Sequence, residues 1–117
     1  MTPPRARAQL SGTPLLPGTL DLLILRVLST GRQHGYGIAQ RLQQVSDDVL
    51  QVGESSLYPA LQRLLLNGDV DAEWGPSDNN RRARYYTLTR AGRKRLAREL
   101  ESFETMVTAI QAVLRTA

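Results

Sequence analysis

The sequence of 117 residues predicts a mainly α fold of the α+β class, in which three short helices, a two-stranded hairpin and one long helix follow one another. Three observations support this prediction. Apolar residues recur every three or four positions along three stretches before residue 68. Apolar and polar residues then alternate at 70–74, and after a turn-forming segment at 75–80 an aromatic and β-branched run follows at 84–88. Beyond it, apolar residues spaced by four and three positions run to residue 114, which indicates a single long helix.

The N-terminal part divides into an arm and a first helix. Residues 1–17 hold four of the six prolines among small and polar residues, which is typical of a flexible arm. Arg5 and Arg7 are able to touch a phosphate backbone there, although a disordered tail is the simpler interpretation. The first helix is expected to begin at Thr19, a good N-cap, and to stop at Gly31. Its apolar face consists of Leu20, Leu23, Ile24, Val27 and Leu28.

A second helix is expected from about Tyr36 to Val45. It opens on residues 34–37, where two glycines permit a tight turn or a close approach of backbones. The helical spacing predicts that Ile38, Leu42 and Val45 face inward.

A third helix is expected from about Glu54 to Asn67, with Gly68 at the position of a C-terminal glycine cap. Its inner face consists of Leu57, Leu61, Leu64 and Leu65. Pro59 lacks an N–H and conflicts with a regular helix at this position. Either the helix is kinked there, or its regular part begins near Tyr58.

The hairpin is predicted from alternation at 70–74 and from the aromatic and β-branched run at 84–88. Trp74 is interpreted as core packing beneath the hairpin. Strand parity predicts that Tyr86 and Leu88 point inward together and that Tyr85 points outward among the arginines.

The last helix is expected to start after Thr89 as N-cap and to reach about Arg115, a length of roughly 40 Å. The roughly 70 residues before it form too small a body to cover such a helix along its length. We therefore expect a second copy of the chain as its partner, and the alternative is packing on the chain's own first helix. The predicted dimer interface consists of Leu96, Leu100, Phe103, Val107, Ile110 and Leu114.

Positive charge is concentrated in one window. Residues 81–98 carry eight basic side chains and no acidic one, whereas the remainder carries seven basic and all 11 acidic residues. A local basic patch is typical of nucleic-acid binding, because phosphate attraction supplies most of the non-specific affinity. The alternative is a solvated face. The second half of the window, at the start of the last helix, would serve either DNA or acidic side chains of a second subunit; it consists of Arg90, Arg93, Lys94, Arg95 and Arg98.

Composition argues against several classes of protein. Without cysteine, neither a disulfide nor a thiolate metal site is possible, and the single histidine, His34, argues against catalytic histidine clusters. No apolar run is long enough to span a bilayer, and no secretory signal is visible. We expect a cytoplasmic protein that is not an enzyme and that uses no metal or other cofactor.

Three helices followed by a hairpin are the order of a winged helix-turn-helix. In that fold the third helix enters the major groove, and the hairpin, or wing, contacts the backbone or the minor groove. Gln62 is suited to pair with adenine and Arg63 with guanine. The candidate DNA-binding residues are Ser55, Ser56, Tyr58, Gln62, Arg63, Arg81, Arg82, Arg84 and Tyr85. The alternative function is a winged-helix module that binds proteins and not DNA.

Three segments resemble the PadR family of bacterial transcriptional regulators, in the right order and spacing over about residues 18–92. They read GYGI at 35–38, SLYPAL at 56–61 with Arg63-Leu64, and RYYTLTRAG at 84–92. The resemblance implies a dimeric repressor that contacts a near-palindromic operator through Tyr58 and the wing arginines, and that is often released by a small molecule. It also implies the small branch of the family, with a single long dimerisation helix.

The sequence patterns and the resemblance together predict a flexible arm at 1–17, a winged helix-turn-helix at 18–89 and a dimerisation helix at 90–117. The sequence departs from the family at Asp69, where an apolar residue is usual. The last helix has no tryptophan, which argues against a pocket that stacks flat aromatic drugs.

Overall fold

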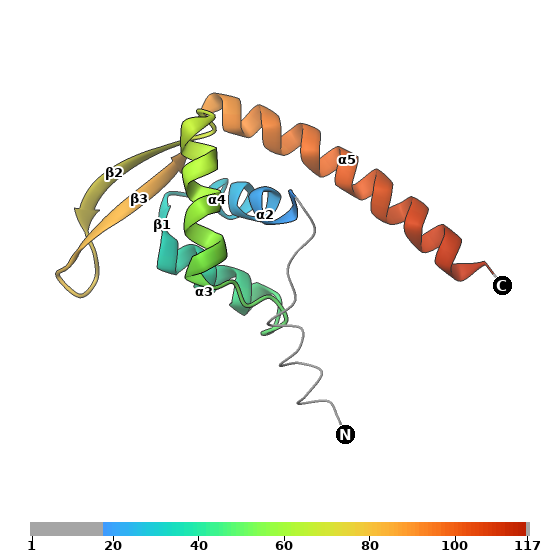
Figure 1. The fold of residues 1–117 in the computed structure, drawn as a ribbon, viewed down its shortest axis with the longest axis horizontal. Coiled ribbons are helices and arrows are strands. Elements are labelled where there is room, and N and C mark those ends of the chain that lie inside the picture. Colours follow the sequence, from blue (N-terminus) through green and yellow to red (C-terminus); the bar gives the residue numbers. More distant parts are fainter. Residues whose placement is uncertain (1–17, 117) are drawn as a thin grey trace, which may run out of the picture.

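The computed structural model describes residues 18–116, so the predicted arm at 1–17 lies outside the described residues. The fold is the predicted winged helix-turn-helix followed by one long helix (Figure 1). Its elements are α2 (Thr19–Leu28), β1 (Gln33–His34), α3 (Gly35–Val45), α4 (Glu54–Leu66), β2 (Val70–Pro76), β3 (Arg82–Leu88) and α5 (Arg90–Arg115).

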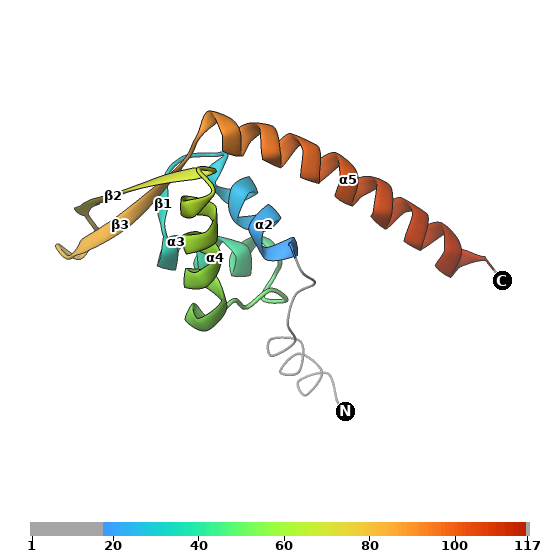
Figure 2. The ribbon, with the colours of Figure 1, turned by 45° about the horizontal axis from the view of Figure 1, so that its top comes forward.

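Helices α2, α3 and α4 pack together into a head from which two extended parts project. Figures 1 and 2 show the β2–β3 hairpin leaving the head on one side and α5 leaving it on the other. We call this hairpin, residues 70–88, the wing. The described residues therefore form a head, a wing and the long helix α5, which extends past the head.

The core lies where the apolar faces of the three helices meet the base of the wing. Its largest fully buried side chains are Ile24, Leu25, Leu28, Ile38, Leu57, Leu61, Leu64 and Val70. The helical spacing thus predicted most of the core correctly. The inward placement of Val45 was wrong, because α3 ends there and the chain turns away, which leaves its side chain 68% exposed. The N-cap of α2 is Gly18, at a φ of 83°, and not Thr19.

A short third strand, β1, was not predicted. It pairs antiparallel with β3, with Gln33 opposite Tyr86 and His34 opposite Tyr85. His34 also caps α3, because its Nδ1 accepts a hydrogen bond from the Gly37 N–H at 3.0 Å. Two residues are too few to show strand alternation, so the sequence held no pattern for β1.

Helix α4 is helical from Glu54 onward and passes through Pro59, so the suggestion that its regular part begins near Tyr58 was wrong. At its C-terminus Gly68 has a φ of 79°, and its N–H donates to Leu65 O at 3.1 Å. The Asp69 N–H donates to Leu64 O at 2.9 Å. This pair of bonds is a Schellman motif, which requires a left-handed residue and thus favours glycine.

Helix α5 is joined to the head by a tight corner. Thr89 caps it as predicted, because its Oγ1 accepts from the Gly92 N–H at 3.0 Å. The same hydroxyl donates to Gly68 O at 2.7 Å, which ties the start of α5 to the end of α4. A Cβ on Gly92 would overlap the carbonyl oxygen of Asp69 and approach Leu88 Cδ1 to 2.8 Å. Only glycine lets the two segments come this close.

We expect Gly92→Ala to lower the free energy of unfolding by about 1–3 kcal/mol, because the added methyl group must push α5 away from backbone atoms. The sign is opposite to the usual gain of about 1 kcal/mol when a helical glycine becomes alanine. Urea unfolding followed by circular dichroism measures the effect. Gly53→Ala is the control, since no atom lies within 4 Å of its new Cβ, and the idea fails if both variants lose equal stability.

Candidate nucleic-acid interface

Helix α4 turns a polar face to solvent on the side opposite its buried leucines. Its exposed polar side chains are accessible to a ligand, as in a DNA-recognition helix; they are Ser55, Ser56, Tyr58 and Gln62. Its N-cap is Gly53, which has no side chain to occupy the free N–H groups of the first turn. These N–H groups and the helix dipole are suited to a phosphate beside Ser55 and Ser56.

The wing places its arginines by strand parity. Trp74 lies opposite Arg84, and Pro76 lies opposite Arg82, so these arginines share one face of the wing with Trp74 and Tyr86. The Arg82 guanidinium lies 5.9 Å from the centroid of the Trp74 ring, and that of Arg84 lies 5.9 Å from the Tyr86 ring. Arg81 is exposed where the turn meets β3.

Trp74 does not pack in the core, so that interpretation was wrong. Its side chain is 58% exposed, whereas Ala72, two residues earlier on the same face, packs against the core. The helices of the head bury the base of the wing and leave Trp74 largely uncovered. It therefore belongs to the candidate interface, although the sequence pattern had placed it in the core.

Tyr86 and Leu88 are buried as predicted, but Tyr85 does not stand among the wing arginines. It lies on the face opposite Arg84 and is half-buried. The centroid of its ring lies 4.3 Å from Arg32 Cζ and 5.4 Å from the centroid of the His34 ring, which is inclined to it by 66°. Its hydroxyl donates to Pro76 O at 2.7 Å. Through these contacts within the chain, Tyr85 stabilises the wing.

A hollow opens between the start of α3, the exposed face of α4 and the inner face of the wing. It has a volume of about 420 Å³, and we call it the notch; it is lined by His34, Gly35, Tyr36, Tyr58, Trp74, Arg82, Ala83, Arg84 and Tyr86. Gly35 allows the Tyr58 ring to approach, because a Cβ would lie 2.9 Å from its Cε1. Burial raises the pKa of Tyr58, and the charges of Glu54 and Tyr86 add to the shift. A phenol is protonated at neutral pH in any case, so the Tyr58 hydroxyl is a hydrogen-bond donor.

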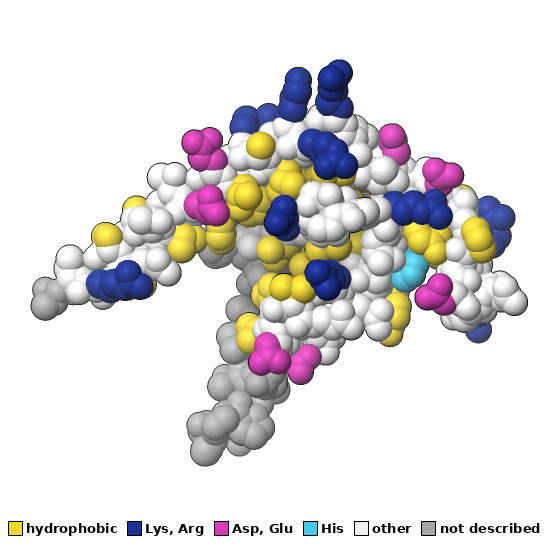
Figure 3. All heavy atoms as spheres, turned by 180° about the vertical axis from the view of Figure 1, so that it is seen from behind, with side chains coloured by type: hydrophobic (Ala, Val, Ile, Leu, Met, Phe, Trp, Pro, Cys, Tyr) yellow, Lys and Arg dark blue, Asp and Glu magenta, His cyan; other side chains and the backbone are white. Residues whose placement is uncertain are grey.

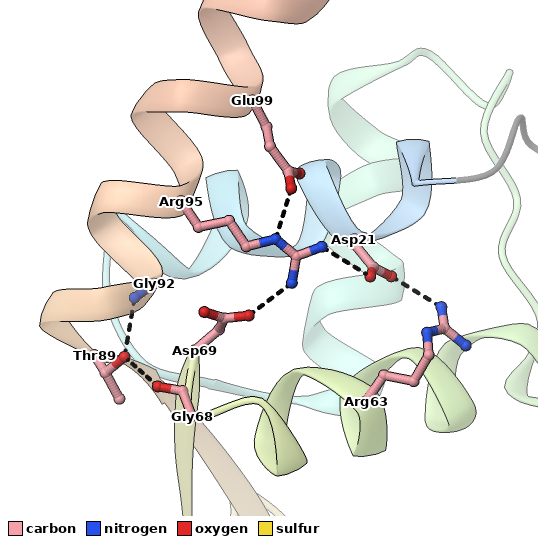
Figure 4. A network of polar contacts seen from close by, with 8 residues as sticks. All are labelled: Asp21, Arg63, Gly68, Asp69, Thr89, Gly92, Arg95 and Glu99. Atoms are coloured by element: carbon pink, nitrogen blue, oxygen red, sulfur yellow. Dashed lines mark hydrogen bonds and ion pairs between the residues drawn. The ribbon is translucent and has the colours of Figure 1, made fainter.

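Arg63 lies on α4 but is not wholly free for DNA. Its Nη2 donates to Asp21 Oδ1 at 2.9 Å, while 57% of its side chain remains exposed (Figure 4). Asp21 on α2 is itself buried. A base contact by Arg63 must therefore use its remaining donors or release Asp21.

Arg95 is partly buried and does not belong to the exposed basic surface. It donates to Asp69 Oδ2 at 2.6 Å, to Glu99 Oε2 at 2.7 Å and to Asp21 Oδ2 at 3.4 Å, and only 19% of its side chain is exposed (Figure 4). We call these four residues the Arg95 cluster. Burial opposes its charged form, but the bonds to Glu99 and Asp69 outweigh burial and hold the pKa of Arg95 above its ordinary value. Asp69, where the resemblance predicts an apolar residue, is thus a partner of Arg95.

The rest of the basic window remains on the surface. Arg90, Arg93, Lys94 and Arg98 are exposed at the start of α5. Figure 3 shows Lys and Arg side chains gathered where α5 leaves the head. Their charge adds to that of the wing and favours a polyanionic partner.

The predicted dimer interface divides into two parts. Leu96 is buried in the chain's own core and Leu100 packs against that core, so the alternative of intrachain packing holds for this first part. The second part projects beyond the head, and its exposed fractions are 42% for Phe103, 48% for Ile110 and 76% for Leu114. Val107 between them is half-buried. Figure 3 shows apolar side chains continuing along this part of α5.

No helix within residues 18–116 combines the length and the apolar character needed to cross a membrane.

Known proteins of similar sequence and shape point to one family. Residues 24–98 match the transcriptional regulator PadR-like family. An uncharacterized protein of Lysinibacillus sphaericus is 29% identical over 83 residues, which make up 71% of this chain and 76% of that one.

Solved structures agree with this match. A transcriptional regulator from Clostridium thermocellum is 29% identical, with a TM-score of 0.72 over 79% of this chain and 89% of that one. A PadR family transcription regulator from Clostridium difficile is 25% identical, with a TM-score of 0.71 over 83% and 99% of the two chains. The winged-helix fold, the polar face of α4 and the basic wing are those of a DNA-binding regulator, and the chain belongs to the PadR-like family of transcriptional regulators.

Proposed function

We propose that the chain is a homodimeric repressor that reads a near-palindromic operator in the bacterial cytoplasm and is released by a small molecule. One observation carries the proposal: the polar face of α4 and the arginines of the wing lie on either side of the notch. In this arrangement α4 lies in the major groove, with Ser55, Ser56, Tyr58 and Gln62 toward the DNA. The wing reaches the adjacent minor groove or backbone with Arg81, Arg82 and Arg84.

The dimer is supported by the projecting part of α5. Phe103, Ile110 and Leu114 would leave an apolar stripe in water if the chain stayed single. Two such helices bury their stripes against each other and relate the two heads by a two-fold axis. Two-fold related heads read two inverted half-sites, with centres about 34 Å or a multiple apart.

Release by a small molecule follows the family resemblance and is compatible with one feature of the head. A mainly apolar cavity of about 300 Å³ lies between α2 and α3, with Arg26 and Arg41 among its lining residues. This volume is at the lower end for small-molecule sites.

A fluorescence anisotropy titration with duplex DNA from upstream of the chain's own gene tests the proposal. Affinity should fall with salt by about 0.9 log units per log unit of salt for each phosphate neutralised. Deleting the gene should raise transcription from the bound promoter. Failure to bind any duplex would favour the alternative, a module that binds an acidic protein partner.

The roles of the wing and of α4 are separable. We expect Arg82→Ala to weaken binding to all sequences alike, because it removes one phosphate contact. The slope of log affinity against log salt concentration should become shallower by about 0.9. Gln62→Ala should reduce the difference in binding free energy between the operator and a scrambled duplex. The expected reduction is about 1–3 kcal/mol, the value of one base contact by Gln62. Titrations of both duplexes at three salt concentrations measure these effects. Arg115→Ala, which removes an equal charge far from the notch, should change neither quantity.

A further inference from the structure

We propose that the notch seats the sugar–phosphate strand that separates the two grooves, with Trp74 packed on a deoxyribose and Arg82 and Arg84 holding the adjoining phosphates. The inference rests on the proposed placement of α4 in the major groove and of the wing in the next minor groove. It adds Trp74 and Tyr36 to the DNA-contacting residues, and it explains why large aromatic side chains are exposed there.

The argument begins with the geometry of the duplex. A major groove and the neighbouring minor groove are separated by one sugar–phosphate strand. A protein that places a helix in one groove and a wing in the other must let that strand pass between them. The notch lies between α4 and the inner face of the wing, and its volume of about 420 Å³ leaves room for part of the strand. The fold therefore determines where the sugar–phosphate strand would pass.

The lining of the notch combines the two chemistries that such a strand needs. Trp74, Tyr36 and Tyr58 are 58%, 66% and 44% exposed, yet they line the same hollow. Exposed aromatic groups that converge in this way mark a binding surface. A deoxyribose offers an apolar face for an indole ring, and phosphate oxygens accept from guanidinium and phenol groups. Phosphate binding alone requires only polar and charged groups, so the exposed indole of Trp74 indicates an additional apolar contact.

The two arginines are held in place for this role. Arg82 lies over the Trp74 ring and half-buried Arg84 over the Tyr86 ring, so the aromatic groups orient both cations before DNA arrives. Glu73 and Asp71 on β2 lie on the other face of the wing and do not compete for them. A phenol is protonated at neutral pH, so the Tyr58 hydroxyl is able to donate to a phosphate oxygen.

Trp74 is the only tryptophan of the chain, so its fluorescence reports directly on the notch. The probe is the duplex from upstream of the chain's own gene, labelled for anisotropy and unlabelled for protein emission. We expect Trp74 emission to be quenched in step with the anisotropy rise. Trp74→Ala should weaken binding about tenfold, and Trp74→Phe should retain most of the affinity because a flat ring remains.

Thr87→Ala is the matched control, since Thr87 is exposed on the other face of the same wing. If the duplex binds but Trp74 emission stays constant and Trp74→Ala binds as tightly as Thr87→Ala, the notch proposal is overturned while DNA binding stands. If wild-type protein binds no duplex, the proposed function itself fails.

Duplexes with a single neutral methylphosphonate linkage locate the contact. At the linkage that crosses the notch, neutralisation should weaken wild-type binding but add little to the loss caused by Arg84→Ala, because both changes remove the same contact. Fully additive losses at every linkage would overturn the role of Arg84.

Discussion

Arg95→Met is expected to lower the free energy of unfolding by about 3–5 kcal/mol, the usual cost of removing one partner from a buried ion pair. Asp69 is 7% exposed and its carboxylate accepts the 2.6 Å bond from Arg95, so the substitution leaves a buried charge without its cation. Asp21 also loses a partner, although Arg63 remains beside it. Urea unfolding followed by circular dichroism measures the loss.

Arg98→Met, on the exposed face of the same helix, is the control and should change stability by no more than about 0.5 kcal/mol. The double substitution of Arg95→Met with Asp69→Leu should recover part of the loss, because it removes the unpaired charge as well. Equal stability of the Arg95→Met and Arg98→Met variants would refute a structural role for the Arg95 cluster.

Phe103→Asp is expected to convert the proposed dimer into monomers and to reduce affinity for the proposed operator by a hundredfold or more. In a dimer the substitution buries a carboxylate in the apolar stripe of α5, at a cost of several kcal/mol. A single head keeps only one half-site and loses the gain from linked binding, which is about a hundredfold at least. Light scattering measures the mass of the particle, and anisotropy measures the affinity.

Thr105→Asp introduces the same charge on the opposite side of α5, about 160° away from Val107 at 100° per residue. It should leave both the mass and the affinity unchanged. The Phe103→Asp monomer should also keep its fold, because Phe103 lies beyond the residues of the chain's own core. Dimers that persist in the Phe103→Asp variant would disprove the stripe as the interface.

The order of the helices α2, α3 and α4, the wing and α5 was predictable because each of these elements repeats a local pattern. Leu57, Leu61 and Leu64 mark the inner face of α4 by spacing alone, and Thr89 marks the start of α5. Strand β1 was not predictable, because its two residues become a strand only by pairing with Tyr86 and Tyr85. Local signals are enough for helices, whereas this strand depends on a partner distant in sequence.

The candidate site was predictable in composition but not in arrangement. The exposed face of α4 and the positions of Arg82 and Arg84 follow from helical spacing and strand parity. Trp74 was wrongly assigned to the core. Alternation shows that it shares a face of β2 with Ala72, but it does not show how far along the wing the helices of the head cover that face. Arg95 was counted with the surface charge, since its bond to Asp69 joins residues 26 positions apart. Asp69 did stand out in the sequence, but only the fold shows its partner.

The Arg95 cluster limits how this chain can be recombined with its relatives. The carboxylate of Asp21 on α2 meets both Arg63 on α4 and Arg95 on α5, and Asp69 meets Arg95 from the corner between α4 and β2. A chimera that exchanges α5 at Thr89 would separate Arg95 from the carboxylates that require it. Such chimeras should therefore fold well when Asp21, Asp69 and Arg95 come from the same parent. A useful crossover keeps α5 through Glu99 with its own head and replaces only the part of α5 after Glu99.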